Sequence, residues 1–326
     1  MEQISTKLTK KDIRDTWKAR WGINRMNYKV DPGLYRVGEA DELSPVLVSA
    51  NYKMSFDMLR KELTGINAWI LVLDTKGINV WCAAGKGTFG TEELVNRIAE
   101  VGLSEVVSHK SLILPQLGAP GIAAHEVEKK SGFKVTYGPV RASDIKEFIT
   151  AGQKASMAMR KVEFSFYDRL RLTPVEIAGA LKTWIIILGS LLILNLIHPG
   201  AFGVIDFYGY TGAILIGCVL VLVLLPWIPG NAFAWKGWLL GMVWVFNMGV
   251  MNNWMGEPDY GLVRMLGYVL VLPAISAYFA MNFTGCSTYT SLSGVIKEMK
   301  FAVPLMITSL ILGVLVILYD SLIYIG

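Results

Sequence analysis

The sequence contains few cysteines and no paired cysteine motif. Cys82, Cys218 and Cys286 are the only three in 326 residues, and none belongs to a C-x-x-C pair. Their scarcity argues against a disulfide scaffold, a zinc site of the paired-cysteine kind and a resident iron–sulfur cluster. A cysteine with a chemical role in this chain must therefore act without a second cysteine beside it.

The chain also lacks a dense block of basic residues interleaved with aromatics. The net charge of +5 is a mild excess, which suits loops beside an anionic membrane surface and argues against a nucleic-acid partner. The first fifteen residues are charged and contain no apolar run, so we expect no signal peptide. The first domain is therefore expected to stay in the cytoplasm.

Long apolar runs, in contrast, fill the second half of the chain. The composition is 53% hydrophobic with a mean hydropathy of +0.45, which is too apolar for an ordinary soluble enzyme. Five runs follow residue 173, at residues 184–197, 212–228, 237–250, 262–281 and 303–325. With its flanks, each reaches the roughly 20 residues needed to cross a bilayer, the third being the shortest. We predict an all-α domain of five transmembrane helices in membrane lipid.

The distribution of positive charge predicts how these helices are oriented. Loops rich in Lys and Arg stay on the cytoplasmic side. Basic residues precede the first, third and fifth runs: Arg160, Lys161, Arg169, Arg171, Lys182, Lys236, Lys297 and Lys300. The pattern predicts a multi-pass protein of the cytoplasmic (inner) membrane, with the N-terminal domain inside and the C-terminus outside. Arg264, at the start of the fourth run, is expected to extend from that helix end to the interface.

The first half of the chain alternates short apolar strands with helices. We predict strands at residues 45–50, 68–74, 111–115 and 134–139, and helices at residues 55–63, 91–102, 121–132 and 142–149, the second with Thr91 as its cap. This alternation predicts a mostly parallel, Rossmann-like α/β sheet. The chain then comprises a lead segment (1–44), an α/β domain (45–155), an amphipathic linker (156–182) and a transmembrane domain (183–326).

Small and turn-forming residues follow three of the predicted strands. They occur in VSANY from residue 48, LPQLGAPG from residue 114 and YGPVRA from residue 137. Ligands of α/β sheets bind beyond the carboxyl ends of the strands. We therefore expect a broad, shallow cleft at this edge, suited to a large flat cofactor more than to a nucleotide phosphate alone.

The stretch INVWCAAGKGTFG, residues 78–90, places a lone cysteine before a run of small residues. A P-loop needs Gly at position 80 and Ser or Thr at position 87, where the chain has Val80 and Gly87. A catalytic thiol needs a base nearby, and a pairing of Cys82 with His109 or His125 is left open by the sequence. So is a plain buried cysteine.

A metal held in a macrocycle is a further alternative for Cys82. A turn at residues 74–77 precedes the cysteine, and the small residues after it leave the backbone nearly bare, so a planar group can lie close. Cobalt in a corrin has four equatorial nitrogens and needs only axial ligands. The D-x-H-x-x-G motif, which supplies histidine to cobalt in many cobalamin enzymes, does not occur around the histidines of this sequence.

The eight residues NVWCAAGK, residues 79–86, resemble the signature of the membrane-bound corrinoid protein family of anaerobic microbial mercury methylation. Residues 48–63, 112–127 and 137–149 resemble the corrinoid domain shared with the large subunit of the corrinoid iron–sulfur protein of acetyl-CoA metabolism. The five-helix tail is similar to that of the mercury-methylation family.

The resemblance implies that Cys82 is the lower axial cobalt ligand of cobalamin or a related corrinoid, whose own base is displaced. Ser49 stands where we expect threonine in the family, and it keeps the hydroxyl. The other cofactor-binding residues are expected to be Asn51, Asn79, Val80, Trp81, Ala83, Ala84, Gly85, Lys86, Gln116, Leu117, Gly118, Ala119, Pro120, Gly121, Gly138, Pro139, Val140, Arg141 and Ala142.

The resemblance further implies methyl transfer from cobalt to Hg(II), giving methylmercury. Hg(II) is an electrophile, so it needs a methyl carbanion or radical equivalent, and a thiolate opposite the methyl group donates charge to cobalt. A position at a helix start would favour the thiolate form of Cys82. The expected partners are a two-cluster ferredoxin-like electron donor and a methyl-folate-dependent methyl donor system.

Two other functions stay open from the residues. A membrane-tethered corrinoid carrier of one-carbon or acetyl-CoA metabolism would methylate a thiol or a nickel centre. A transporter is the third, although the apolar runs lack the constellation of Asp, Glu, Lys and His expected of coupled transport. Cys218 and Cys286 are expected to be packing residues, with Cys286 also a candidate relay for Hg(II).

Overall fold

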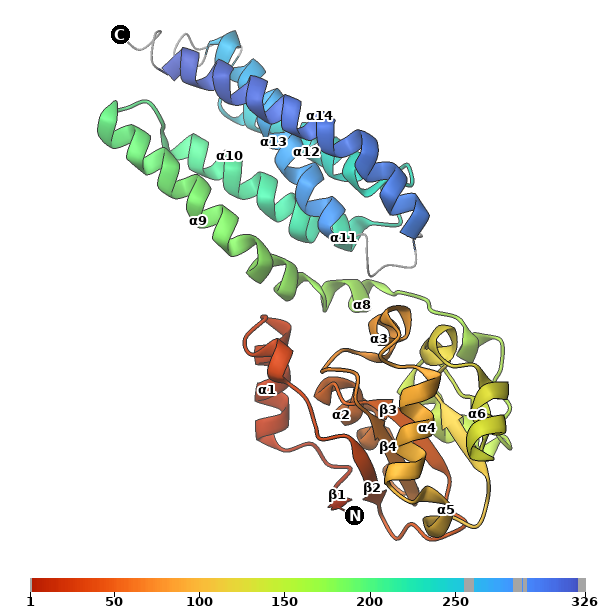
Figure 1. Cartoon of the computed structure of the whole chain (residues 1–326). Helices are drawn as coiled ribbons and strands as arrows, with labels where there is room; N and C mark the ends of the chain where they lie inside the picture. The colour runs from red at the N-terminus through yellow and green to blue at the C-terminus, as the bar shows by residue number, and fades with distance from the viewer. Residues whose placement is uncertain (1, 255–260, 284–288, 290–291, 322–326) are drawn as a thin grey trace. The chain divides into compact units, whose positions relative to one another are not determined.

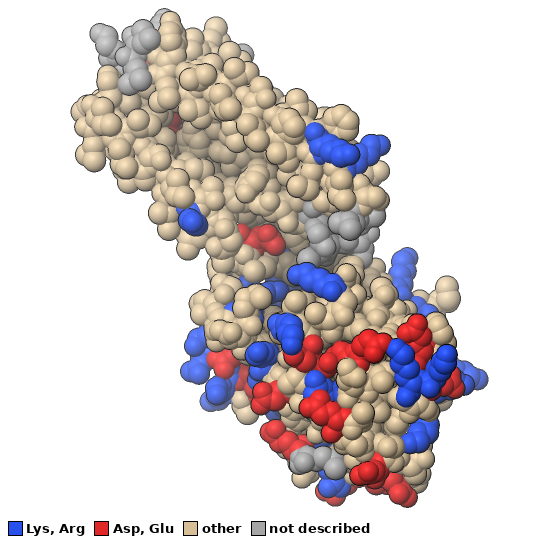
Figure 2. Space-filling model, in the orientation of Figure 1, with Lys and Arg blue, Asp and Glu red and all other residues tan. Residues whose placement is uncertain are grey.

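The computed structural model describes residues 2–254, 261–283, 289 and 292–321. The chain divides into two compact units, Met1–Glu163 and Phe164–Gly326. The first is an α/β unit and the second is helical (Figure 1). Charged side chains crowd the surface of the α/β unit, whereas the visible surface of the helical unit is almost free of them (Figure 2).

A six-stranded mixed sheet forms the centre of the α/β unit. The strands are β1 (Glu2–Ile4), β2 (Gly33–Val37), β3 (Val46–Ala50), β4 (Ala68–Leu73), β5 (Ser111–Leu114) and β6 (Lys134–Tyr137), in the order β1-β2-β4-β3-β5-β6. The four predicted strands are confirmed, and all four run parallel. The segment before residue 45 adds β1 and β2, and β2 pairs antiparallel with β4.

Four of the seven α-helices described in the α/β unit lie near the predicted ranges, and three of these four begin at shifted positions. They are α1 (Lys10–Arg20), α2 (Lys53–Glu62), α3 (Val80–Lys86), α4 (Thr91–Glu100), α5 (Leu103–Val106), α6 (Ala124–Ser131) and α7 (Ile145–Thr150). The helix predicted from residue 121 begins three residues later, because a 3-10 helix, η2 (Gln116–Gly121), precedes it. Thr91 is not the cap of α4: Gly90 holds that position, and the Thr91 hydroxyl accepts the Ala123 N–H at 2.9 Å.

Both faces of the sheet are covered, which explains why the central strands β3 and β4 are apolar at every position except Ser49. Val48, Leu71 and Leu73 pack in one apolar cluster with residues of α3, α4 and α6. Leu47, Ile70 and Val72, which point to the opposite face of β3 and β4, pack in a second cluster with residues of α2 and α7. The carboxyl ends of β3, β4, β5 and β6 therefore meet at one edge, between the two helical layers (Figure 1).

The helical unit consists of long apolar helices with one broken span. It contains α8 (Phe166–Leu170), α9 (Thr173–Ile197), α10 (Val204–Leu215), a π-helical turn (Ile216–Leu220), α11 (Val221–Leu224), α12 (Phe233–Met251), α13 (Leu262–Asn282) and α14 (Leu292–Tyr319). Cys218 is buried in the π turn. Cys286 lies outside the described residues.

The five predicted runs are mainly helical over their described residues. Among the described residues, four helical stretches are long and apolar enough to cross a membrane: Phe166–Ile197, Val204–Leu224, Leu262–Asn282 and Ser293–Tyr319. The third predicted run, α12, is not one of the four; it contains Lys236, Asn247 and three tryptophans.

The prediction that Arg264 extends to an interface is wrong. Its side chain is 4% exposed, and its guanidinium pairs with Asp206 at 3.2 Å and with Asp320 at 3.6 Å. The Tyr268 hydroxyl also donates to Asp206. These residues connect the ends of α10, α13 and α14. The helical unit therefore contains a buried ionic cluster, which the apolar pattern of its sequence did not predict.

Two further basic residues that entered the orientation argument are buried. Arg169 donates to the carbonyl oxygens of Phe164 at 2.7 Å and Val223 at 3.2 Å. Lys236 donates to those of Leu225 at 2.6 Å and Ile228 at 2.7 Å. Both cations satisfy carbonyl groups at and beyond the end of α11 that have no partner within the helix. Both side chains therefore serve internal hydrogen bonds. The predicted membrane orientation then depends on the remaining basic residues.

Replacing Arg264 with leucine is expected to destabilise the helical unit by about 3–5 kcal/mol, because the substitution leaves Asp206 buried without its cationic partner. The measurement is thermal unfolding of the purified full chain in detergent. Lys182→Leu removes an exposed charge from α9 and serves as the control, with little expected change. Equal unfolding temperatures for the two variants would contradict the role given to the cluster.

Candidate functional site

Cys82 lies in the first turn of α3. This helix follows β4, after a turn, at the carboxyl edge of the sheet (Figure 1). The helix begins there because the Asn79 side chain caps it: Asn79 Oδ1 accepts the Cys82 N–H at 3.0 Å. The thiol-bearing residue is half-buried, between buried Val80 and Ala83 and exposed Trp81. At seven residues α3 is short, so the dipole effect predicted for the thiol is small.

The turn before α3 is held by Asn51, which follows β3. Asn51 is 1% exposed. Its side-chain oxygen accepts the N–H groups of Thr75 at 3.1 Å and Gly77 at 2.9 Å, and also the Thr75 hydroxyl. Its amide nitrogen donates to Asp74 at 3.1 Å. Since these bonds occupy the side chain, the contribution of Asn51 to the site is to position α3.

Asp74 belongs to the same network and stays ionised at neutral pH. Burial acts to raise the pKa of Asp74, but hydrogen bonds from Lys76 and Asn51 outweigh it and hold this pKa below its ordinary value. The stabilisation is present above the unfolded-state pKa and is lost as the pH falls through the lowered one. The turn that presents α3 is therefore intact at neutral pH and loosens only in acid.

Asn51→Ala is expected to destabilise the turn and α3 by about 2–4 kcal/mol, because two buried backbone N–H groups lose their acceptor. The readout is faster amide hydrogen exchange over residues 74–86 of the full chain. Asn67→Ala is the matched control, since the exposed Asn67 side chain accepts one N–H, from Glu39. Unchanged exchange in Asn51→Ala would show that the turn does not depend on this amide.

The glycines of the site divide into two kinds. A Cβ atom added at Gly85 or Gly87 meets nothing within 4 Å, so the backbone of α3 borders open space there. A Cβ atom at Gly118 would lie 2.4 Å from the Phe89 ring, and one at Gly121 would lie 2.2 Å from the Phe89 oxygen. The backbone is thus open at Gly85 and Gly87, whereas Gly118 and Gly121 must be small because their own chain packs on them.

Ser49 lies on the other face of the sheet from α3. It alternates along β3 with Val48 and Ala50, which pack in the same cluster as Val80 and Ala84 of α3. Ser49 is buried, and its hydroxyl donates to the adjacent Ala50 carbonyl at 3.3 Å. The structure therefore does not place this hydroxyl beside Cys82.

The loops after β5 and β6 lie against each other at the same edge of the sheet. The Gln116 N–H donates to the Pro139 carbonyl at 3.4 Å, and the Gln116 side chain accepts from Arg160 at 2.5 Å.

The other predicted residues of these loops lie close by. The 3-10 helix η2, which packs on α3, contains Leu117, Ala119 and Pro120. Gly138 to Ala142 follow β6, where the Val140 N–H donates to Met159 at 2.8 Å and Arg141 is exposed near Glu163. The predicted segments are thus neighbours, although most of their polar groups have partners within the chain.

His109 is not brought to Cys82 by this fold. His109 precedes β5 and its ring contacts the Ser44 carbonyl at 2.9 Å, at the amino ends of the parallel strands, opposite the edge that carries α3. His125 is exposed on α6. Over the described residues, no three His, Cys, Asp or Glu side chains gather closely enough to hold a metal ion. A metal at Cys82 must therefore bring most of its own ligands.

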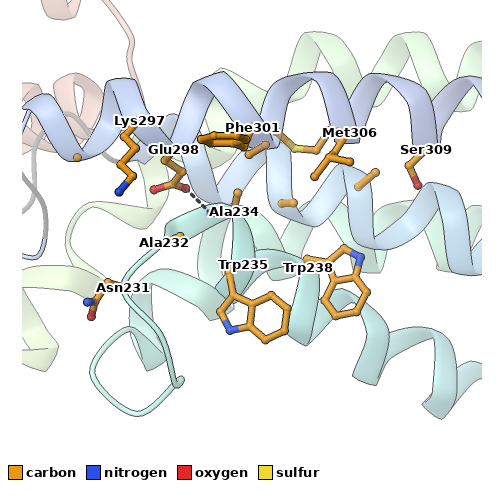
Figure 3. A pocket seen from close by; sticks show the side chains of 15 residues that line it. Asn231, Ala232, Ala234, Trp235, Trp238, Lys297, Glu298, Phe301, Met306 and Ser309 are labelled. Atoms are coloured by element: carbon orange, nitrogen blue, oxygen red, sulfur yellow. Dashed lines mark hydrogen bonds between the residues drawn. The ribbon is translucent and has the colours of Figure 1, made fainter.

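A separate apolar groove lies within the helical unit, between α12, α13 and α14 (Figure 3). Its volume is about 780 Å³. Trp235 and Trp238 stack on one side with ring centroids 5.3 Å apart, and Phe301 and Met306 line the other. Lys297 and Glu298 stand at one end, where Glu298 accepts the Ala234 N–H at 2.6 Å. These walls suit hydrocarbon, so the groove is unsuited to the polar rim of a large cofactor.

Comparisons with known proteins cover the part of the chain that contains this site. Residues 22–149 match the family model described as CO dehydrogenase/acetyl-CoA synthase delta subunit. The chain is 34% identical over 123 residues to the acetyl-CoA decarbonylase/synthase complex subunit gamma of Methanopyrus kandleri, covering 37% of this chain and 26% of that protein. It is 30% identical over 125 residues to the corrinoid/iron-sulfur protein large subunit of Moorella thermoacetica, covering 38% and 28%.

The chain thus spans about a quarter of the length of the curated relatives that it matches. The matched residues run from the segment before β2 to α7 and include Cys82, whereas α1 and the helical unit lie outside them. Over residues 22–149, this chain is therefore homologous to subunits of acetyl-CoA decarbonylase/synthase complexes and to the large subunit of a corrinoid/iron-sulfur protein.

Proposed function

We propose that the α/β unit binds a corrinoid at the carboxyl edge of its sheet, with Cys82 as the lower axial ligand of cobalt, and that the protein transfers the methyl group that this cobalt carries. The observation on which the proposal depends is the half-buried Cys82 in the capped first turn of α3, beside a backbone that is open at Gly85 and Gly87. The homology over residues 22–149 supports the choice of cofactor.

The residues present fit such a group. Cys82 would supply one sulfur donor, and a corrin brings four nitrogens of its own, which suits a site without a multi-residue metal cluster in the described chain. When bound, the corrin cobalt supplies a transferable methyl group. The chain fixes the approach of the thiol through Asn79 and Asn51, and the bare face of α3 leaves room for a planar ring.

Two acceptors for the methyl group are proposed, each supported by a different observation. One named relative is a subunit of an acetyl-CoA decarbonylase/synthase complex and the other is the large subunit of a corrinoid/iron-sulfur protein. These names favour a membrane-tethered methyl carrier that serves a thiol or a metal centre of acetyl-CoA chemistry. The single thiol within NVWCAAGK favours Hg(II), because a sulfur ligand donates charge to cobalt and assists transfer to an electrophile. The homology by itself supports the carrier better.

The helical unit would anchor the protein in a membrane. Apolar side chains such as Ile185 and Leu196 of α9 and Leu305 of α14 are more than half exposed, a surface that bilayer hydrocarbon accommodates and water does not. A cytoplasmic position of the α/β unit, a ferredoxin-like electron donor and a methyl-folate-dependent methyl donor complete the proposal.

Methyl transfer from the methylcobalamin-loaded full chain decides between the acceptors. Hg(II) and a small thiol are offered separately, and methylmercury and the methyl thioether are quantified. Rapid methylmercury formation with slow thiol methylation would support the mercury reaction. The reverse result would support the carrier, and a chain that retains no cobalamin would contradict both.

A further inference from the structure

An exposed pair of tryptophans distinguishes α1 from the other helices of the α/β unit. Trp17 is 59% exposed and Trp21, at the end of the helix, is 42% exposed; Ile13, one turn before Trp17, is 51% exposed. The three are spaced four residues apart and so share one helix face. Ile23 and Met26, which follow α1, are exposed as well. A soluble unit seldom leaves such a ridge bare.

The opposite face of α1 is fixed to the unit, so the ridge is presented outward. Asp12 pairs with Lys53 at 2.7 Å and with Arg60 at 2.9 Å. Thr16 contacts the Tyr28 hydroxyl at 3.0 Å, and Ala19 is fully buried. Hydrogen bonds from Lys53 and Thr9 hold the pKa of Asp12 well below its ordinary value against the opposing effect of burial, so these ion pairs persist at neutral pH.

Positive charge flanks the ridge. Lys10, Lys11, Arg14 and Lys18 are exposed on α1. Its two carboxylates are both engaged, Asp12 on the inner face and Asp15 with Arg14 at 3.6 Å. A helix with tryptophan and isoleucine on one face and basic residues beside them has the composition that binds the headgroup region of an anionic bilayer.

We propose that α1 docks on the surface of an anionic phospholipid membrane and holds the α/β unit against it. The proposal rests on the membrane placement of the helical unit given above and is independent of the corrinoid. The same chain continues from the α/β unit into the apolar helix α9, so the membrane is always within reach and a weak surface contact suffices. The family model that matches from residue 22 does not include α1. This is expected if α1 serves membrane contact, which only a membrane-anchored chain needs.

Tryptophan quenching by brominated lipid tests the docking in the full chain. The chain is reconstituted in phosphatidylcholine vesicles with and without phosphatidylglycerol, each with ordinary or brominated acyl chains. The emission lost in Trp17→Phe/Trp21→Phe isolates the two indoles, while phenylalanine keeps the apolar face. We expect bromine to remove about half or more of this difference emission when phosphatidylglycerol is present, and little without it.

Charge variants separate docking from chance exposure. Lys11→Glu/Arg14→Glu/Lys18→Glu is expected to abolish the quenching of the two indoles, whereas Lys129→Glu/Lys134→Glu/Lys146→Glu, an equal charge change at exposed sites of the same unit, is expected to preserve it. Difference emission that bromine leaves unchanged in chains that float with the vesicles would overturn the proposal and leave α1 as a surface for a protein. Chains that do not float would overturn the membrane placement as well.

Discussion

Cys82→Ala is expected to lower methyl transfer by at least about 100-fold, since losing even an outer partner of a metal ligand typically costs 10–100-fold. The substitution removes the one sulfur that the first turn of α3 offers to cobalt, while Asn79 still caps the helix. The fold should persist because the cysteine is half-buried and alanine has a good helix propensity. The measurement is the initial rate of product formation from methylcobalamin-loaded full chain.

Two further cysteine variants test whether the loss of methyl transfer is specific to the sulfur of Cys82. Cys218→Ala changes a thiol buried in the π turn of the helical unit, and its transfer rate should stay near that of the natural chain. Cys82→His offers a nitrogen ligand in place of sulfur, so we expect it to bind cobalamin but to transfer methyl poorly to Hg(II). A near-normal rate in Cys82→Ala would remove the basis for axial ligation.

Gly85→Ala is expected to have opposite effects on stability and on cofactor binding. In the chain alone, the new methyl group meets nothing within 4 Å, and replacing glycine by alanine inside a helix stabilises it by about 0.5–1 kcal/mol. If a corrin lies against the bare side of α3, the same methyl group intrudes on it, and cobalamin affinity should fall about tenfold or more. Amide exchange of α3 and a cobalamin titration measure the two effects.

Gly121→Ala serves as the contrasting variant. Its Cβ atom would lie 2.2 Å from the Phe89 oxygen and 3.0 Å from Ala84 Cα, so the contact between η2 and α3 must open. Stability and affinity should then fall together. A Gly85→Ala chain that is stabilised and binds cobalamin as tightly as before would show that the cofactor lies elsewhere.

Much of the α/β unit could be predicted because its central strands β3 and β4 are almost wholly apolar. β3, β4 and β5 are short, mostly apolar runs bounded by turn residues, a pattern that marks strands buried on both faces, whereas β6 reads KVTY. β1 and β2 could not be predicted in the same way. β2 reads GLYRV, and it is a strand because β4 offers it an unpaired edge, a tertiary effect that local propensity does not contain.

Charge was the least predictable feature of the helical unit. Arg264, Asp206 and Asp320 are far apart in the sequence, and each alone resembles a residue at the end of a helix. Their pairing depends on how α10, α13 and α14 pack. The exposed face of α1 could not be predicted for the same reason, since the exposure of Trp17 and Trp21 depends on the ion pair that fixes Asp12 to Arg60.

The candidate site was predictable in its position more than in the roles of its residues. The sequence places small residues after several strands, and the fold brings α3, η2 and the loop after β6 to one edge. The sequence does not reveal that the Asn51 side chain is used to hydrogen-bond the turn before α3. Nor does it reveal that Ser49 lies on the face of the sheet away from α3. Gly118 and Gly121 likewise serve packing on Phe89. Such distinctions depend on side-chain partners that come from remote parts of the chain.

X-ray absorption at the cobalt edge of the purified, cobalamin-loaded full chain tests the central claim most directly. The account predicts a sulfur scatterer in the axial position of cobalt, present in the natural chain and in Cys218→Ala and absent in Cys82→Ala. A nitrogen or oxygen ligand there in the natural chain, or a sulfur signal that survives in Cys82→Ala, would contradict the account.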